Sequence, residues 1–388
     1  MTFDIAWLAQ GKLRYKSGDG APVTLESPFA NGIRERAVKA QQRHSWKFGG
    51  EGDKFLSAAM LWGRANHDPA AIPIFITSLC RSARSGELLY SLETDSMCAI
   101  LAIEKAGTDE RRLWHKNDKR LSHLAVGEDG ALACSLRHKF GTANIAVRVD
   151  EEAGFSEVTE GDSVDTAPRW VKGARRKLVF QSAGIGRTRE GHFAALGPYS
   201  VQSLEVETGE LKTLVEDPAC DFLTPYCTSD DVLYFIRRPY CTGRELNPLT
   251  LLKNIVLFPF RLLFAVFQFL QFFSMRYTGK KLTAGGDAAG REPDMKEMMI
   301  WGNMVSAKAA KGADDSASLV PSSWELVRRN ANGSEDVLAK GVVSFDVASD
   351  GSVVYSNGNG VFLMDLTGRS ERIAKEAMVE QVVILGET

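Results

Sequence analysis

Histidine and cysteine are the residue types best suited to metal binding or proton transfer, and the chain has six of each. The histidines never pair at i and i+4 or lie beside a run of carboxylates, which argues against a zinc or general-base motif. No G-x-S-x-G nucleophile elbow occurs either. The sequence therefore predicts no catalytic, cofactor-binding or metal-binding residue. The six histidines are His44, His67, His115, His123, His138 and His192.

The cysteines are scattered along the chain and form no C-x-x-C pair. The last three lie closer together, but their spacing does not match a zinc site and no histidine is near them. We expect all six to be small buried hydrophobic residues. They are Cys80, Cys98, Cys134, Cys220, Cys227 and Cys241.

A glycine-rich segment from Ala183 to Phe193 carries the candidate recognition residues. Its glycines permit positive φ angles and close approach of a ligand, and Arg187 with Arg189 could hold an anion. A phosphate-binding loop would lead from a strand into a helix, whereas a strand follows here. Two interpretations stay open: a long surface hairpin, or a loop that recognises a protein partner. The residues concerned are Arg187, Arg189, His192 and Phe193.

These residues must be positioned by a repeated unit of four short strands, which recurs from about residue 85 onward. The clearest unit begins at Val342, turns at Ser349 and ends near Ala374, and another is split, beginning at Phe222 and resuming at Trp324. One four-stranded sheet cannot bury both faces alone, so neighbouring units must stack, as in a β-propeller. Six units fit the blade period of about 40–50 residues.

The expected fold class is all-β, a six-bladed β-propeller with two helical insertions at about 28–44 and 249–275. The last strand-like run, Gln381 to Leu385, follows the sixth unit, so we expect it to pair with the first strand and close the ring without free edges. The whole chain, 1–388, is expected to be one propeller. A helical insertion would cover 27–57 in or after the first blade, and a Phe-rich helical insertion with its linker would cover 241–320 within blade five.

The first insertion begins with a helix start signal, Ser27 followed by Pro28. From there to about His44, Ile33, Ala37 and Ala40 recur on one face of an amphipathic helix. We expect this face to pack against the propeller, while a basic surface facing a partner is the alternative.

One unit also carries a recognisable signature. The run from Asp162 to Trp170 (DSVDTAPRW), followed by Lys177 to Ser182, resembles the D-x-x-P-x-W…(I/L)-x-F-x-S pattern of TolB-like six-bladed propellers. The similarity covers about 85–240 well and 322–376 less closely. It implies a propeller fold like that of uncharacterised bacterial TolB-like proteins, and not a particular task. The family's W-S-P-D-G turn appears here as Trp170 to Ala174, and the lipoprotein partner of TolB itself is not implied.

Composition and charge exclude some classes of protein. With 44% hydrophobic residues the chain is not mainly disordered. Lys and Arg number 47 against 49 Asp and Glu, so no overall positive field attracts nucleic acid. The first residues lack the basic and apolar regions of a secretory signal, which leads us to expect a cytoplasmic protein.

The stretch from Leu249 to Met275 holds seven of the twenty phenylalanines within sixteen residues. Pro259 interrupts it, and Asn254, Arg261 and Gln268 recur every seven residues as a narrow polar stripe along a helix. The wide apolar face cannot remain in water. Three interpretations stay open: an anchor lying in a membrane surface, a helix covered by a partner or a second copy, and a single transmembrane span. The expected contact residues are Leu257, Phe258, Phe260, Phe264, Phe267, Phe269, Phe272 and Phe273.

These observations predict a non-enzymatic protein-interaction scaffold that is peripherally membrane-associated, with a single-pass protein as the alternative. Its expected partners are an unidentified protein and, through the Phe-rich insertion, a membrane surface; nucleic acid is not expected, and a homodimer through the same helix is a further option. The alternative function is an enzyme or small-ligand-binding protein with a site in the central channel. Perturbed ionisable groups at the axis would favour this alternative, and a plain polar channel would count against it.

Overall fold

Short, mainly apolar runs fold into strands that pair antiparallel with their neighbours in sequence in a computed structural model of the chain. The structure describes residues 3–45, 74–84, 86–105, 107, 109–117, 119–150, 153–174, 176–241, 297–300, 303–306 and 317–387. The chain divides into two units, Met1–Tyr240 with Met298–Thr388, and Cys241–Glu297. The description below concerns the first unit.

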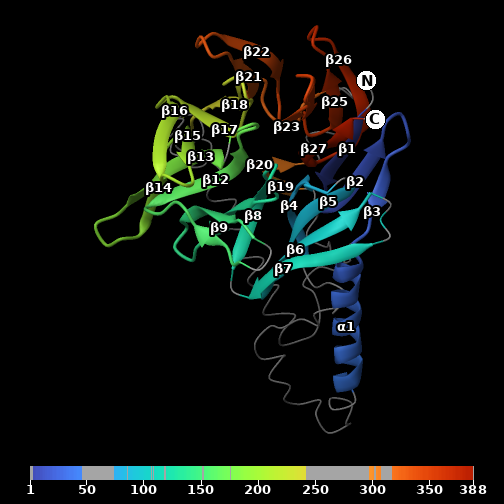
Figure 1. Cartoon of the computed structure of the whole chain (residues 1–388). Helices are drawn as coiled ribbons and strands as arrows, with labels where there is room; N and C mark the ends of the chain where they lie inside the picture. The colour runs from blue at the N-terminus through green and yellow to red at the C-terminus, as the bar shows by residue number, and fades with distance from the viewer. Residues whose placement is uncertain are drawn as a thin grey trace, which may run out of the picture. The chain divides into compact units, whose positions relative to one another are not determined.

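The first sheet joins the two ends of the chain. Strand β27 (Val379–Glu387) pairs antiparallel with β1 (Phe3–Ala9), and β2 (Lys12–Ser17) and β3 (Val23–Leu25) complete the sheet. Figure 1 shows β27 and β1 side by side. The predicted pairing of the last strand-like run with the first strand is therefore confirmed.

Three other sheets follow the predicted repeat of four strands. The strand bounds are β4 (Phe75–Arg81), β5 (Glu87–Glu93), β6 (Met97–Glu104), β7 (Glu110–Asn117), β17 (Cys220–Cys227), β18 (Leu233–Pro239), β21 (Glu325–Arg329), β22 (Glu335–Lys340), β23 (Ser344–Val347), β24 (Val353–Ser356), β25 (Gly360–Met364) and β26 (Ser370–Lys375). The sheets are β4 to β7, β17-β18-β21-β22, and β23 to β26. In the second of them β18 pairs with β21 across residues 240–324, which confirms the predicted split unit.

Two more sets of four strands are linked into a nine-stranded sheet. The strand bounds are β8 (Arg120–Val126), β9 (Leu132–Arg137), β10 (Ala143–Arg148), β11 (Ser156–Glu157), β12 (Ser163–Trp170), β13 (Lys177–Arg187), β14 (Phe193–Leu196), β15 (Ser200–Glu205) and β16 (Glu210–Val215). One set is β8 to β11, and the other is β12, β13, β15 and β16, with β14 extending β13 as a hairpin. The link between the sets is a single parallel pair, Ala143 with Val164.

The innermost strands of these sheets form a closed ring. Strand β27 contacts β4, β4 contacts β8, β8 contacts β12, β12 contacts β17, β17 contacts β23, and β23 contacts β27. We call the end of the ring where these strands begin, marked by Phe75 and Val379, the start end. The end where they stop, marked by Arg81 and Glu387, is the finish end. In a four-stranded antiparallel sheet, the turn between the second and third strands lies at the start end.

Helix α1 (Pro28–Ser45) follows β3 and confirms the helix predicted over about 28–44. Ser27 caps it, because its Oγ accepts a hydrogen bond from Ala30 N–H at 3.0 Å. Phe29 and Ile33 pack against the buried cluster between the first two sheets, as predicted for Ile33. Figure 1 shows α1 extending from the first sheet.

The second predicted helix, 249–275, lies outside the described residues. Within the predicted insertion over 241–320, the structure describes a two-stranded sheet of β19 (Glu297–Ile300) and β20 (Asn303–Ser306). The predicted domain limits, one propeller over 1–388 with insertions over 27–57 and 241–320, stay predictions. In the described parts of the chain, no helix is long and apolar enough to span a bilayer.

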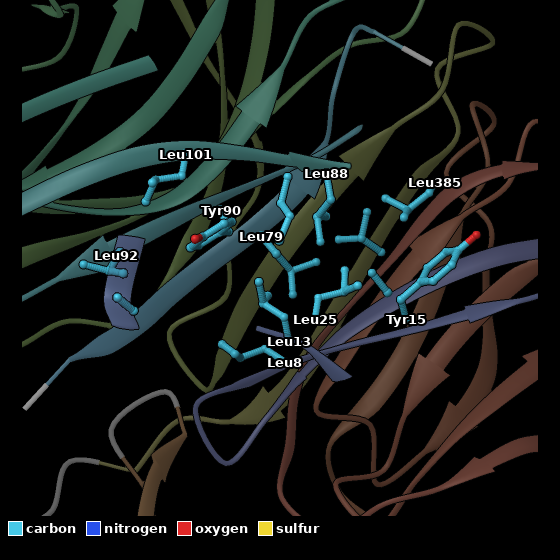
Figure 2. Close-up of a cluster of buried hydrophobic side chains, with 14 of the residues drawn as sticks. Leu8, Leu13, Tyr15, Leu25, Leu79, Leu88, Tyr90, Leu92, Leu101 and Leu385 are labelled. Carbon is cyan, nitrogen blue, oxygen red and sulfur yellow. The ribbon is translucent and has the colours of Figure 1, made fainter. Parts of the chain in front are cut away.

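The hydrophobic core is divided among the interfaces between neighbouring sheets. One cluster joins the first sheet to β4, β5 and β6, and its fully buried members include Leu13, Leu79, Leu88 and Tyr90 (Figure 2). Burying one such side chain contributes roughly 1.5–3 kcal/mol. Because these contacts are made between sheets, each sheet depends on its neighbours for stability.

Gln381 of β27 ties the first sheet to β4 of the next. Its Oε1 accepts a hydrogen bond from Leu79 N–H at 3.0 Å, and its Nε2 donates to the Leu79 carbonyl at 2.8 Å. Leu79 is fully buried. One side-chain amide therefore satisfies two backbone groups that water cannot reach.

We predict that Gln381→Ala lowers the free energy of unfolding by about 1–3 kcal/mol, because both Leu79 groups lose a partner in the interior. Gln202→Ala is the matched control, since the Gln202 amide bonds to Ser200 and Thr213 near the surface. It should change stability by less than about 0.5 kcal/mol. Urea unfolding measures both variants, and equal losses would contradict the proposed role of Gln381.

Candidate binding site in the central channel

Three inner strands bulge at corresponding positions. Pairing is interrupted in β8 between residues 122 and 125, in β12 between 166 and 169, and in β17 between 223 and 226. Within these bulges His123, Ala167 and Thr224 have positive φ angles of 55°, 53° and 49°. Thr224 N–H, freed from the ladder, donates to Gln181 Oε1 at 2.7 Å. Such bulges redirect the side chains that follow them.

Two cavities lie along the axis and share Leu124 and Arg169. The first, of about 610 Å³, is lined at the finish end by residues such as Arg81. The second, of about 470 Å³, is lined at the start end by residues such as Phe75 and Glu380. Arg169, which directly follows the bulge in β12, therefore lies where the two cavities meet.

An ion pair crosses the channel at this point. Arg169 Nη1 lies 3.0 Å from Asp346 Oδ1, which joins β12 to β23 past the intervening strand β17. The other carboxylate oxygen, Asp346 Oδ2, accepts a hydrogen bond from Ile384 N–H at 2.9 Å. The Arg169 guanidinium also lies 6.0 Å from the ring centre of Tyr226 on β17. Four inner strands thus hold one charged pair in place.

Three ionisable side chains of the channel are in forms poorly suited to catalysis at neutral pH. Burial raises the pKa of the Cys80 thiol to about 12 and the pKa of Tyr226 to about 12, so both stay protonated. Burial, together with the charges of Arg137 and Arg169, lowers the pKa of His123 to about 4, so its imidazole is neutral. This arrangement fits ligand binding better than nucleophilic or acid–base catalysis.

Glu380 differs from these three groups. Burial raises the pKa of its carboxyl to about 7, although a hydrogen bond from Gly11 N–H opposes the shift. Its neutral and ionised forms therefore coexist near neutral pH. A perturbed carboxyl that lines a cavity is one of the features expected for a ligand or enzyme site in the channel.

The predicted recognition residues lie on the hairpin of β13 and β14. Arg187 Nη2 is 2.6 Å from Asp162 Oδ1, so this guanidinium is paired with a carboxylate instead of facing an anion together with Arg189. Arg189 and His192 are exposed, and Phe193 is 56% exposed. The structure thus gives a surface hairpin, and recognition of a partner by this loop stays a prediction.

The other sequence predictions have mixed outcomes. The eight expected contact residues between Leu257 and Phe273 lie outside the described residues. Four cysteines are buried as predicted, but Cys220 is only partly buried and Cys241 is exposed, because Cys241 follows the last paired residue of β18. Among the described residues, no three His, Cys, Asp or Glu side chains lie close enough together to hold a metal ion.

The residues that line the channel were not among the sequence candidates. Arg169 stands in the TolB-like signature directly after Pro168, and Tyr226 follows Pro225 in the next unit. Aligning these two units would have identified the position that faces the axis. Asp346 carries no such signal, because it lies 177 residues from Arg169.

We predict that Asp346→Ala lowers the free energy of unfolding by about 1–3 kcal/mol, because Ile384 N–H and Arg169 both lose their acceptor in a mostly buried place. Asp346→Asn should lose less, since the amide oxygen can still accept from Ile384. Asp336→Ala is the control, because its ion pair with Arg328 is exposed to solvent and should contribute much less to stability. Urea denaturation measures the unfolding free energy of the three variants. If Asp346→Ala loses no more stability than Asp336→Ala, the proposed role of Asp346 is wrong.

Glu380 gives a pH dependence with a defined sign. Its pKa is raised from 4.5 to about 7 in the folded protein, so the native state binds more protons than the unfolded state between these values. The stability that this group contributes is therefore fully present below pH 4.5 and is lost as pH rises through 7, by on the order of 1–3 kcal/mol. Glu380→Gln should flatten this part of the pH profile in urea unfolding, whereas exposed Glu371→Gln should leave it unchanged. An unaltered profile for Glu380→Gln would refute the assignment.

Comparison with known proteins adds the fold relationship. No protein-family model and no curated protein matches the sequence. The structure of TolB from Acinetobacter baumannii matches over 99% of this chain and 67% of its own, with a TM-score of 0.51 and 12% identity. A putative TolB from Agrobacterium tumefaciens matches over 80% of this chain and 85% of its own, with a TM-score of 0.42 and 13% identity. An oligogalacturonate lyase in complex with manganese covers 76% of this chain and 63% of its own, with a TM-score of 0.37 and 11% identity. At these identities the likeness concerns the fold and not the activity. The chain has a TolB-like β-propeller fold.

Proposed function

We propose that this chain is a six-bladed propeller that acts as a non-enzymatic binding scaffold at a membrane surface. Six blades are inferred from the sheet topology. Four sheets contain four strands each, and the nine-stranded sheet separates at its single parallel pair into two further sets of four. The closed sequence of contacts among β27, β4, β8, β12, β17 and β23 supports the same number.

Membrane association is supported by the exposed phenylalanines of the propeller. Phe140 is 80% exposed, Phe193 is 56% exposed and Phe75 is 51% exposed. All three are at the start end: Phe75 begins β4, Phe140 lies in the turn from β9 to β10, and Phe193 follows the turn from β13. Aromatic side chains exposed on three different sets of strands at one end favour contact with an apolar partner or a bilayer interface.

The connection that contains the Phe-rich stretch leaves and rejoins its sheet at the same end. Strands β18 and β21 are the second and third strands of their sheet, so residues 240–324 leave and rejoin the sheet at the start end. This connection contains the apolar run from Leu249 to Met275. Lys139 and Arg189, next to or near two of the exposed phenylalanines, add positive charges that attract anionic headgroups. We infer peripheral association through this end, with the finish end left open to a ligand or protein partner.

The non-enzymatic part of the proposal rests on the protonation states in the channel. Cys80 and Tyr226 keep their protons at neutral pH, and neutral His123 is a weak base. The cavities themselves favour the alternative of a small-ligand-binding protein, which is compatible with a scaffold. An enzyme whose chemistry depends on Glu380 is the less supported option.

Sedimentation with vesicles of phosphatidylcholine and phosphatidylglycerol tests the membrane proposal. The full chain should sediment with the vesicles, and deletion of residues 249–281 should leave a folded propeller that stays in the supernatant. Phe140→Ser with Phe193→Ser should weaken binding about tenfold or more, because two apolar side chains no longer leave water. Leu366→Ser is the matched control, since Leu366 is 71% exposed in the turn between β25 and β26, which lies at the finish end.

The outcomes separate the interpretations. If the deletion variant still sediments with vesicles, the proposal that the Phe-rich stretch anchors the chain to the membrane is wrong. If the full chain ignores vesicles but forms a dimer in light scattering that the deletion abolishes, the Phe-rich stretch is a homodimer contact. If Leu366→Ser weakens binding as much as the double phenylalanine variant, the assignment of the start end is wrong.

A further inference from the structure

We propose that the finish-end cavity binds the carboxylate of a small organic acid, with Arg169 as its principal partner and Arg81 at the rim. This inference deepens the proposed binding function and rests on its assumption that the channel accepts a ligand. It does not depend on membrane association, which concerns the opposite end.

The charges around the cavity favour a single negative charge on the ligand. Four basic and three acidic residues line it, which leaves a net charge of +1. Arg176 is shared between Asp129 and Glu207, at 3.7 and 3.6 Å. Arg81 makes no ion pair with any residue that the structure describes, and it is exposed at the end of β4. The charged lining residues are Arg81, Arg169, Lys172, Arg176, Glu128, Asp129 and Asp346.

Arg169 is held in position with donors to spare. A guanidinium has five N–H donors, and the bond to Asp346 Oδ1 occupies one nitrogen, Nη1. Asp346 is fixed in turn by Ile384 N–H at 2.9 Å. A planar guanidinium fixed in this way suits the bidentate geometry of a carboxylate. Asp346 acts as a positioning residue and need not be displaced.

Arg81 and Arg169 act on the same region of the cavity. Both charges lower the pKa of Cys80 and of Tyr226, whereas burial and the Asp346 carboxylate raise it. Cys80 and Tyr226 themselves line the cavity. An anion placed beside these two side chains would therefore be attracted by two arginines and repelled by one carboxylate, which is already paired with Arg169.

The remaining lining is mainly apolar and would accommodate the body of the acid. Leu79, Val126, Trp170, Val347 and Val383 border the same space of about 610 Å³. Pockets of a few hundred Å³ or more, with an apolar lining and few polar groups, hold small molecules whose polar end fixes their orientation. A phosphate group, which carries up to two negative charges at neutral pH, is less well matched by a net lining charge of +1.

Ligand-observed NMR titration of the full chain tests the inference, with hexanoate, the neutral isostere hexanamide and butyl phosphate as probes. Hexanoate should bind at least about tenfold more tightly than hexanamide, as one charge-assisted hydrogen bond allows. Arg169→Gln should weaken hexanoate binding about tenfold or more without changing the affinity for hexanamide. Arg81→Gln should weaken hexanoate binding several-fold, and this variant should fold normally because Arg81 is an exposed residue at a strand end.

Arg328→Gln is the matched control, since it removes the same charge from an exposed position on β21. It should leave hexanoate affinity unchanged, and thermal unfolding confirms that every variant is folded. The inference is overturned if hexanoate does not bind, if hexanamide binds equally well, or if folded Arg169→Gln and Arg81→Gln both bind hexanoate like the wild type. Tighter binding of butyl phosphate than of hexanoate overturns the assignment of a carboxylate. Vesicle sedimentation of the same variants should be normal in all these cases, so failure here is distinct from failure of the membrane proposal.

Discussion

The pairing of β27 with β1 is the constraint on which the other sheets depend. Residues from opposite ends of the chain form the first sheet, so the ring of inner strands closes only when the last strand is in place. Gln381 then connects this strand to Leu79 of β4 through two hydrogen bonds. Since the hydrophobic clusters lie between sheets, opening the ring would expose one face of the first sheet and one face of its neighbour. Closure therefore stabilises the ring as a whole and not only one sheet.

The channel chemistry follows from how the inner strands are arranged in this ring. A bulge in β12 frees Arg169 from regular strand geometry, and the side chain reaches Asp346 on β23 beyond the neighbouring strand. The same kind of bulge in β17 places Tyr226 beside the guanidinium. These side chains meet only because the ring fixes the positions of separate strands. The site is thus a property of the closed propeller, which agrees with the general rule that function on a common fold depends on a local site.

Much of the fold could be predicted from the sequence, and little of the site. The repeated strands, the split unit that resumes at Trp324, the closing strand and the helix after Ser27 all have local signals: short apolar runs, turn residues and a helix cap. Arg169 has only the weak signal of its place after Pro168 in the signature, and Asp346 has none, because it is an ordinary charged residue that meets Arg169 across 177 residues. Sequence reasoning instead selected Arg187 and Arg189, whose glycine-rich context suggested a binding loop. Arg187 proved to be paired with Asp162, a residue that the same reasoning had assigned to the fold signature.

The two ends of the ring have different physical characters, and this difference follows from the topology of each sheet. Turns between the first and second strands lie at the finish end and are short, so they leave the cavity with Arg81 and Arg169 accessible. Connections between the second and third strands, or between one sheet and the next, lie at the start end, where the chain can accept long insertions without disturbing strand pairing. Both long interruptions, residues 46–73 after α1 and the connection from β18 to β21, occupy such positions. The proposed membrane contact therefore concerns the start end, and the cavity that contains Arg81 and Arg169 is lined at the finish end.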